Sequence, residues 1–216
     1  MKYTTVLFDL DGTLLNTLDD LADSVNYSLE QFGYPTHPIS SIRQFVGNGI
    51  RKLIERAIPD GLNNPNFDAC YDCFVEHYAK HNRDKTDLYP GIIKLIKDLD
   101  NKNIKMAIVT NKLQSASEIL LEDFFKPYIN VVIGDVPERQ NKPHPDGINA
   151  ALEVLNVTDK SAVLYIGDSD VDAMTAINSG LDYLLCTWGF RDRDQLTDYK
   201  PLAFIDTPSE IKTYVL

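Results

Sequence analysis

The sequence has 216 residues, of which 44% are hydrophobic and 25% are charged, an ordinary composition for a globular protein with a substantial core. Its 32 acidic residues outnumber the 21 Lys and Arg residues, which gives a formal net charge of -11 at pH 7. This excess of negative charge argues against nucleic acid or an anionic membrane as the main partner, and an anionic substrate would need a local cation.

The N-terminus predicts neither a signal peptide nor a membrane anchor. The apolar run at residues 6–8 is broken by Asp9, and no later run approaches the roughly 18 apolar residues of a membrane helix. The three cysteines, Cys70, Cys73 and Cys186, are an odd number in a chain with a sizeable core, so a disulfide framework is not expected. We therefore expect a cytoplasmic protein with reduced thiols.

The first predicted strand carries two carboxylates. The segment VLFDLDGTLL, residues 6–15, is mostly apolar, as is typical of a strand buried on both faces, yet it holds Asp9 and Asp11 two positions apart. Buried charges are costly unless a partner compensates them. Gly12 can turn the chain directly after the pair. The pattern therefore raises the hypothesis of a functional site where this strand ends.

A long helix-rich interval follows the first strand. About ninety residues separate it from the second strand, far more than one crossover helix needs. Apolar residues recur at helical spacing from Leu18 to Phe32, with Thr17 as a possible N-cap and Gly33 as a stop signal. Further helices are predicted within residues 49–61 and 66–82. We infer a helical insert over residues 17–83.

The rest of the chain alternates short β-rich runs with helix-like stretches. Strands are predicted within residues 4–10, 105–111, 129–135, 162–168, 182–189 and 202–206, and helices within residues 89–103, 115–125, 144–156 and 169–180. The alternation favours an α/β fold: a Rossmann-like parallel sheet core with helices on both faces, plus an inserted α-helical cap domain. The predicted core comprises residues 1–16 and 84–216, and the predicted cap residues 17–83.

Polar residues follow several of these strands at the edge where ligands bind in open α/β sheets. They are Asp9 and Asp11, Thr110 and Asn111, and Asp168 with Ser169, Asp170 and Asp172. Lys142 lies in the segment NKPHPDG, a loop that opens a helix. A parallel sheet would bring these residues together.

Such a cluster has a chemical logic. Asp9, Asp11 and Asp168 would repel one another unless a cation lay among them, and oxygen ligands suit Mg²⁺. One carboxylate could then act as a nucleophile toward phosphorus. Lys142 would neutralise phosphoryl oxygens, and the Thr110 hydroxyl could donate a hydrogen bond to one of them.

Four motifs in order resemble the haloacid dehalogenase superfamily of phosphotransferases. They are DLDGT at residues 9–13, VTN at 109–111, NKPHP at 141–145 and GDSDVD at 167–172. The resemblance covers the core nearly end to end, and the helical insert falls where family members with a helical cap carry theirs. Within the superfamily, DLDGTLLNTLDDL, VGNGIRKLIERA and YPGI are most similar to the phosphoglycolate phosphatase branch.

The resemblance implies a role for each motif residue. Asp9 would be the nucleophile and a metal ligand, and Asp11 the general acid/base with its backbone carbonyl on the metal. Lys142 would stabilise the phosphoryl group and the nucleophile. Asp168 would ligate Mg²⁺. The supporting and substrate-binding residues would be Asp172 and Ser169 beside the metal, Thr110 and Asn111 at the phosphoryl group, and Gly12 and Thr13 after the nucleophile.

The segment VGNG leaves two interpretations open. It is either an ordinary loop before the next helix or a cap loop over the active site, with Gly47, Asn48 and Gly49 facing the substrate. In the second case a cap cation, which would be Arg43, Arg51 or Lys52, could meet a substrate carboxylate. Each of these three residues is individually more typical of a surface charge.

The segment CYDCFVEHYAKH also suggests a zinc site made of Cys70, Cys73, His77 and His81. Its ends lie eleven residues apart, roughly 16 Å along a helix. Four tetrahedral ligands at about 2.0–2.3 Å cannot come from such a span. The spacing of Phe67, Cys70, Phe74 and Tyr78 instead predicts a buried face of the cap.

We therefore predict a Mg²⁺-dependent phosphatase of a small phosphate monoester, with 2-phosphoglycolate as the first-choice substrate. The chain is expected to be a monomer or homodimer without nucleic-acid or membrane partners. One alternative is a sugar-phosphate mutase, although Thr13 after the glycine favours phosphatases. The other is a non-catalytic binding module on the same fold.

Overall fold

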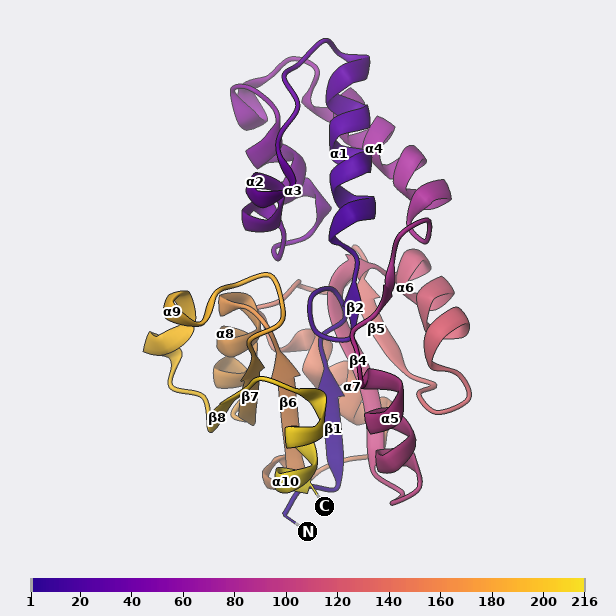
Figure 1. Cartoon of the computed structure of the whole chain (residues 1–216), viewed down its shortest axis with the longest axis vertical. Helices are drawn as coiled ribbons and strands as arrows, with labels where there is room; N and C mark the ends of the chain where they lie inside the picture. The colour runs from indigo at the N-terminus through magenta and orange to yellow at the C-terminus, as the bar shows by residue number, and fades with distance from the viewer. Residues whose placement is uncertain (1, 216) are drawn as a thin grey trace.

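The computed structural model describes residues 2–215. Its main feature is a six-stranded sheet in the order β5-β4-β1-β6-β7-β8, with every neighbouring pair parallel (Figure 1). The strands are β1 (Thr5–Phe8), β4 (Lys105–Leu113), β5 (Val132–Asp135), β6 (Val163–Gly167), β7 (Asp182–Cys186) and β8 (Ala203–Ile205). All six predicted strands and the predicted α/β fold class are confirmed.

Strand β1 lies at the centre of the sheet and is covered on both sides. Val6 and Phe8 belong to one hydrophobic cluster, whereas Leu7 belongs to another. Successive side chains of a strand point to opposite faces, so a continuous apolar run is what a strand between two layers needs. This explains why the residues before Asp9 are apolar without alternation.

Helices form the two outer layers (Figure 1). The first cluster packs the sheet against α5 (Ile92–Asp100), α6 (Gln114–Leu120) and α10 (Lys212–Val215), and the second packs it against α7 (Asp146–Val154) and α8 (Asp170–Ser179). The helix predicted within residues 115–125 is divided, because α6 passes into the π-helix η2 (Leu121–Phe125). The shorter elements are α9 (Arg193–Leu196), η3 (Lys160–Ala162), η4 (Thr197–Tyr199) and η5 (Pro208–Ile211).

Most of the interval between β1 and β4 folds as a separate helical layer, drawn at the top of Figure 1. It contains α1 (Leu18–Gln31), α2 (Ile39–Phe45), α3 (Ile50–Ala57), η1 (Gly61–Asn63) and α4 (Phe67–His81). These helices share a hydrophobic cluster of their own. An antiparallel ribbon, β2 (Leu15–Asn16) with β3 (Asp87–Leu88), lies where the chain leaves and rejoins the core. We propose that residues 17–83 form a cap domain that this ribbon connects to the core. We call these residues the cap below.

Local predictions for the cap have mixed outcomes. The predicted face of α4 is confirmed, because Phe67, Cys70, Phe74 and Tyr78 are all buried. Thr17 is the N-cap of α1 as predicted, and its carbonyl accepts from the Leu21 N–H, but its buried hydroxyl has no hydrogen-bond partner among the described residues. Between residues 2 and 215, no helix is both long enough and apolar enough to cross a membrane.

Asp20 ties the start of α1 to the returning chain. Its buried carboxylate accepts hydrogen bonds from the backbone N–H groups of Lys85 and Thr86 and from the Thr86 hydroxyl. These bonds join the two chain segments that connect the cap to the core. The connection is therefore built on one buried charge with several donors.

We expect Asp20→Ala to lower the free energy of unfolding by about 1.5–3 kcal/mol, because a charged acceptor is lost and buried donors are left without a partner. Urea unfolding followed by circular dichroism measures the change. Asp19→Ala is the matched control, because Asp19 is adjacent in α1 and its side chain makes no hydrogen bond within residues 2–215. Equal effects of the two substitutions would contradict the proposed tie.

Candidate active site

The turn after β1 places Asp9 beside Asp168. The Asp9 backbone N–H donates to the Ile166 carbonyl of β6, which continues the parallel pairing to the end of the strand. Gly12 has φ +93°, and a Cβ there would lie 2.4 Å from Asp168 Oδ2. Only glycine fits this turn, because a side chain at residue 12 would collide with the Asp168 carboxylate.

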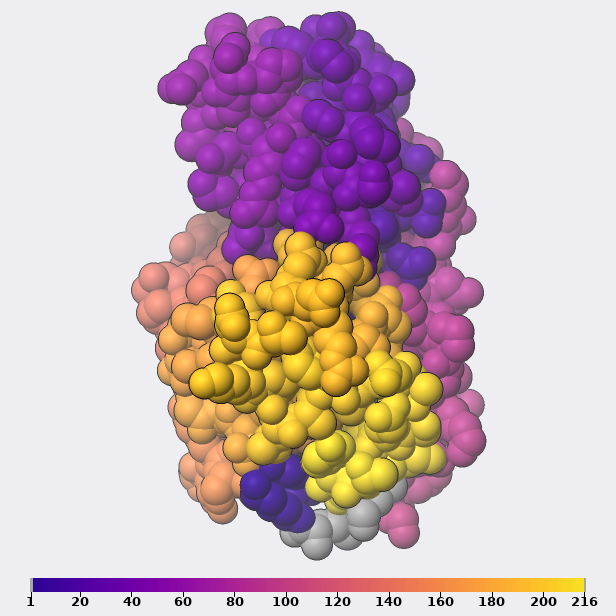
Figure 2. Space-filling view, turned by 60° about the vertical axis from the view of Figure 1, so that its left-hand side comes forward, coloured from indigo at the N-terminus to yellow at the C-terminus, as the bar shows by residue number. Residues whose placement is uncertain are grey.

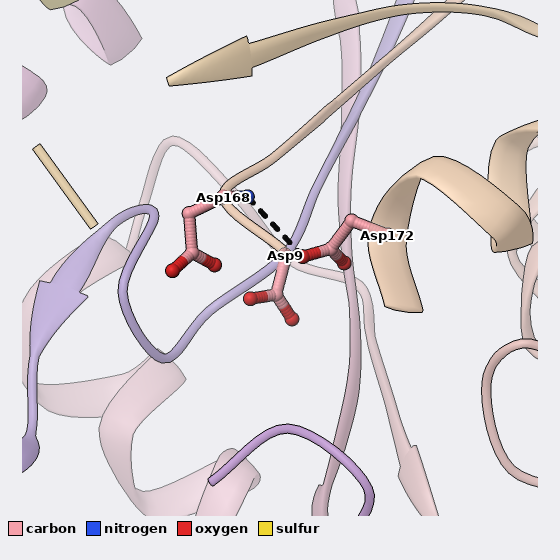
Figure 3. A group of neighbouring side chains, drawn as sticks. All are labelled: Asp9, Asp168 and Asp172. Atoms are coloured by element: carbon pink, nitrogen blue, oxygen red, sulfur yellow. Dashed lines mark hydrogen bonds between the residues drawn. The ribbon is translucent and has the colours of Figure 1, made fainter. Parts of the chain in front are cut away.

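Three carboxylates converge at this edge of the sheet. Oxygen atoms of Asp9, Asp168 and Asp172 lie within 4.8 Å of one another, and all three residues are buried. In Figure 3 the carboxylates of Asp9 and Asp168 point into the same space, while Asp172 reaches across from the start of α8. Within residues 2–215 this is the one His, Cys, Asp or Glu group whose ligand atoms are close enough to hold a metal.

Burial and mutual repulsion make the ionised forms of these carboxylates unfavourable without a nearby cation. Burial, reinforced by Asp172 and Asp168, raises the pKa of Asp9 well above its ordinary value. Burial and then Asp172 raise the pKa of Asp168 to about 7. Both shifts mean that the ionised carboxylates are destabilised as they stand. A divalent cation would reverse this, and an all-oxygen donor set fits Mg²⁺.

Lys142 supplies positive charge to the same group. Its Nζ donates to Asp9 Oδ1 at 2.6 Å, to Asp172 Oδ1 at 2.7 Å and to the Tyr165 hydroxyl at 3.1 Å. Although burial opposes it, Lys142 together with neighbouring donors keeps the pKa of Asp172 below its ordinary value. Lys142 thus holds Asp172 ionised and leaves the other oxygen of Asp9 without a hydrogen bond from the described residues.

Asn111 fixes the position of Lys142, and Ser169 fixes the position of Asp172. The Asn111 side chain accepts from the Lys142 backbone N–H at 2.7 Å and donates to the Lys142 carbonyl at 3.0 Å, which fixes the loop that carries Lys142. It also donates to the Gly47 carbonyl of the cap. Ser169 is the N-cap of α8 and forms a capping box with Asp172, whose Oδ2 accepts from the Ser169 hydroxyl at 2.6 Å.

Asp11 lies apart from the three carboxylates. Its Oδ1 accepts from Lys112 Nζ at 2.8 Å, and the same ammonium donates to the Tyr78 hydroxyl of α4 at 2.6 Å. Sequence analysis identified neither Lys112 nor Tyr78 as a residue of the site. The available signal was a lysine directly after VTN at the end of β4, whereas nothing in the sequence indicates that Tyr78 of the cap reaches it.

A cavity between core and cap joins these groups. The core contributes its carboxylates, Thr110, Asn111 and the two lysines, and the cap contributes Gly47, Gly49, Tyr78 and several apolar side chains. A water-sized sphere can place its centre in a volume of about 60 Å³. That is room for a few water molecules, which favours a small ligand.

Two further cavity residues, Phe190 and Arg191, were also missed. The Phe190 backbone N–H donates to Asp168 Oδ2 at 2.6 Å. Arg191 donates to the carbonyls of Arg43 at 2.9 Å and Val46 at 2.7 Å, across the boundary between core and cap. In Figure 2 the violet atoms of the cap meet the orange and yellow atoms of the C-terminal part of the chain.

Several predicted substrate contacts do not line the cavity. Thr13 contacts Asp168 through its hydroxyl at 3.4 Å, and Gly12 serves the turn. Asn48 accepts from Arg56 at 2.7 Å. Among the predicted residues outside the cavity, Arg43 donates to the Gly189 carbonyl and pairs with Asp192. Gly12 and Thr13 therefore make contacts within the core, and Asn48 makes its contact within the cap. Arg43 joins the cap to the core.

The other two candidate cap cations are also engaged elsewhere. Arg51 pairs with Asp68 and stacks over Phe67, and Lys52 pairs with Glu55. Both side chains are more than half exposed, at 60% and 52%. Surface charge, the alternative interpretation of these residues, agrees with their positions.

Comparisons with known proteins identify the family of this chain. A family model described as haloacid dehalogenase-like hydrolase matches residues 6–186. The phosphoglycolate phosphatase of Psychrobacter arcticus is 33% identical over 224 residues, covering 100% of this chain and 97% of its own. The phosphoglycolate phosphatase of Caulobacter vibrioides is 32% identical, covering 94% and 89%. The crystal structure of a candidate phosphoglycolate phosphatase from Lactobacillus delbrueckii subsp. bulgaricus has a TM-score of 0.93 at 31% identity, covering 100% and 99%.

The carboxylate group yields a prediction that needs no activity assay. In the presence of EDTA, Asp168→Asn should raise the free energy of unfolding by about 1 kcal/mol or more, because it removes one of several buried like charges. Mg²⁺ at a hundredfold excess over its dissociation constant should stabilise the unaltered protein by about 2.7 kcal/mol and Asp168→Asn much less. Denaturant unfolding measures both. Asp100→Asn, at the exposed end of α5, is the control, and an equal Mg²⁺ effect in all three proteins would place the ion elsewhere.

Proposed function

The chain belongs to the haloacid dehalogenase-like hydrolases, and we propose that it is a phosphatase that cleaves the phosphate monoester of a small metabolite through a phosphate held on Asp9. One observation carries the proposal. Asp9 has one oxygen fixed by Lys142 and the other without a hydrogen bond, beside Asp168 and Asp172 at the base of a small cavity. This is the arrangement that a carboxylate nucleophile requires.

Asp9 and Asp168 would hold Mg²⁺, in the proposal with the backbone carbonyl of Asp11, and Asp172 would support them, because both of its oxygens already accept from Lys142, Tyr165 and Ser169. Mg²⁺ bound there supplies the positive charge that lets an anionic phosphoryl group approach three carboxylates. Lys142 orients Asp9 and keeps Asp172 ionised. Thr110 lines the cavity and can donate its hydroxyl to a phosphoryl oxygen.

The proposed reaction has two steps. In the first, the free Asp9 oxygen attacks phosphorus, the bond from phosphorus to the ester oxygen breaks, and that oxygen takes a proton from Asp11. In the second, water attacks phosphorus, gives a proton to Asp11, and releases Asp9 together with inorganic phosphate. Asp11 is restored to its starting state after each cycle.

The first candidate substrate is 2-phosphoglycolate. Relatives that cover nearly the whole chain are named phosphoglycolate phosphatases. The small cavity also suits a substrate of this size better than a nucleotide or a sugar bisphosphate. The three cysteines are free thiols, which supports the further proposal of a cytoplasmic location.

A phosphate-release screen tests the function. With Mg²⁺, we expect 2-phosphoglycolate to lead a panel of phosphomonoesters that includes hexose phosphates. EDTA should abolish turnover and Mg²⁺ should restore it, whereas Ca²⁺ should inhibit because its larger coordination shell spoils in-line geometry. Conversion of hexose 1-phosphate to hexose 6-phosphate without phosphate release would identify a mutase instead. Full turnover in excess EDTA would exclude the proposed metal.

The two carboxylates of the first strand should be separable by kinetics. Asp9→Asn should form no phosphoenzyme. Asp11→Asn should react with p-nitrophenyl phosphate in a burst, because nitrophenolate leaves without a proton, and then turn over about 10²–10⁴-fold more slowly, because water lacks its base. Rapid-quench mass spectrometry should find the phosphate on Asp9.

An alkyl phosphate provides the control for this experiment, because its alkoxide needs the proton and should show no burst with Asp11→Asn. Equal losses for aryl and alkyl esters, with no phosphoenzyme trapped, would contradict the assigned roles. A phosphate trapped on Asp11 would reverse them.

A further inference from the structure

Three cationic side chains line the cavity, namely Lys112, Lys142 and Arg191. They differ in how many of their N–H groups already have acceptors. An ammonium has three N–H donors and a guanidinium has five. A cation whose donors are all engaged can orient its neighbours but has none left for a substrate. A cation with a free N–H group can therefore bind a substrate, whereas a cation without one can only orient its neighbours.

Lys142 has no donor to spare. Its three N–H groups are matched by Asp9, Asp172 and Tyr165. Arg191 uses four of its five N–H groups, which donate to Asp170 and to the carbonyls of residues 43, 44 and 46. Its guanidinium is thus directed at the cap backbone.

Lys112 is different. Two of its N–H groups donate to Asp11 and Tyr78, and the third has no acceptor within residues 2–215. Its side chain is 2% exposed, so bulk water does not readily supply one. The Tyr78 hydroxyl accepts from Lys112, and its own proton likewise has no acceptor among the described residues. Burial raises the pKa of Tyr78 to about 12, so this proton is retained at neutral pH.

The position of these two donors indicates which part of a substrate they would meet. Lys112 lies 2.8 Å from Asp11, the residue proposed to protonate the ester oxygen. Groups beside Asp11 therefore face the leaving group, whereas the phosphoryl group belongs at Asp9. An acceptor that takes a hydrogen bond from both an ammonium and a hydroxyl is best provided by an anionic group with two oxygens.

We propose that Lys112 and Tyr78 together recognise a carboxylate on the leaving-group side of the substrate. The substrate class would then be the phosphate ester of a small hydroxy acid whose carboxylate lies next to the ester carbon. The proposal rests on the phosphatase function proposed above and narrows its substrate. It also transfers the role expected of Arg43, Arg51 or Lys52 to a core lysine and a cap tyrosine.

A matched pair of substrates tests this assignment. 2-Phosphoglycolate and ethyl phosphate differ by a carboxylate in place of a methyl group. The measured quantity is the discrimination ratio, defined as kcat/KM for 2-phosphoglycolate divided by kcat/KM for ethyl phosphate, with Mg²⁺ present. Lys112 also pairs with Asp11, so its loss can slow both substrates, and only the ratio isolates recognition of the carboxylate.

Lys112→Met should lower the discrimination ratio about 10- to 100-fold, because a charge-assisted hydrogen bond to the carboxylate is lost. Tyr78→Phe keeps the packing of the ring and should lower the ratio about 3- to 10-fold, mainly through a higher KM for 2-phosphoglycolate. Lys94→Met is the control, because Lys94 is 74% exposed on α5 and pairs with Asp98. Its ratio should equal that of the unaltered protein.

The outcomes separate the two proposals. A discrimination ratio near one in the unaltered protein, or losses in both variants that are equal for the two substrates, would overturn the carboxylate site and leave the phosphatase function standing. Hydrolysis of neither substrate, together with no phosphate release across the wider panel, would overturn the function itself. If Lys112→Met does not fold, Tyr78→Phe alone decides, because it leaves the pair between Lys112 and Asp11 in place.

Discussion

The repulsion among buried carboxylates is the constraint around which this site is organised. Asp9, Asp168 and Asp172 lie within 4.8 Å of one another, and the single ammonium of Lys142 cannot neutralise all three. Other interactions in the fold must therefore offset the unfavourable free energy of burying these carboxylates together. The fold does so with a central strand that is apolar from Val6 to Phe8 and with donors directed at each carboxylate. The remaining negative charge supports the proposal that a divalent cation binds here.

The parallel sheet provides the proximity, and small residues provide the close fit. The carboxyl ends of β1 and β6 are neighbours because the two strands pair from Thr5–Val163 to Phe8–Ile166. The loop after β7 then closes over Asp168, and a Cβ at Gly189 would lie 2.3 Å from the Cβ of that aspartate. The same loop continues to Arg191, which donates a hydrogen bond to the Val46 carbonyl of the cap. One short segment thus connects the carboxylate group to the part of the chain that covers it.

The sequence was sufficient for features that depend on local pattern. Apolar runs identified all six strands, and the positions of Asp9, Asp168 and Lys142 at strand and loop ends predicted that they would meet. Features that depend on how the cap sits on the core were not predictable in this way. Lys112 and Tyr78 meet only because α4 lies over the end of β4, and no periodicity encodes that placement. The choice of Arg43 as a substrate contact followed charge alone, whereas in the structure its guanidinium binds Gly189 and Asp192.

The boundary between core and cap has a consequence for selectivity. Asn111 of the core donates to the Gly47 carbonyl of the cap, and Lys112 of the core donates to Tyr78 of the cap. Each contact joins a residue that follows Thr110, which we propose binds the phosphoryl group, to a cap element that lines the cavity. A ligand that accepts from both Lys112 and Tyr78 would stabilise the closed arrangement in proportion to the hydrogen bonds it makes with both parts. A substrate without the second anionic group would gain less from closure, so under this proposal cap closure would be the step that distinguishes substrates.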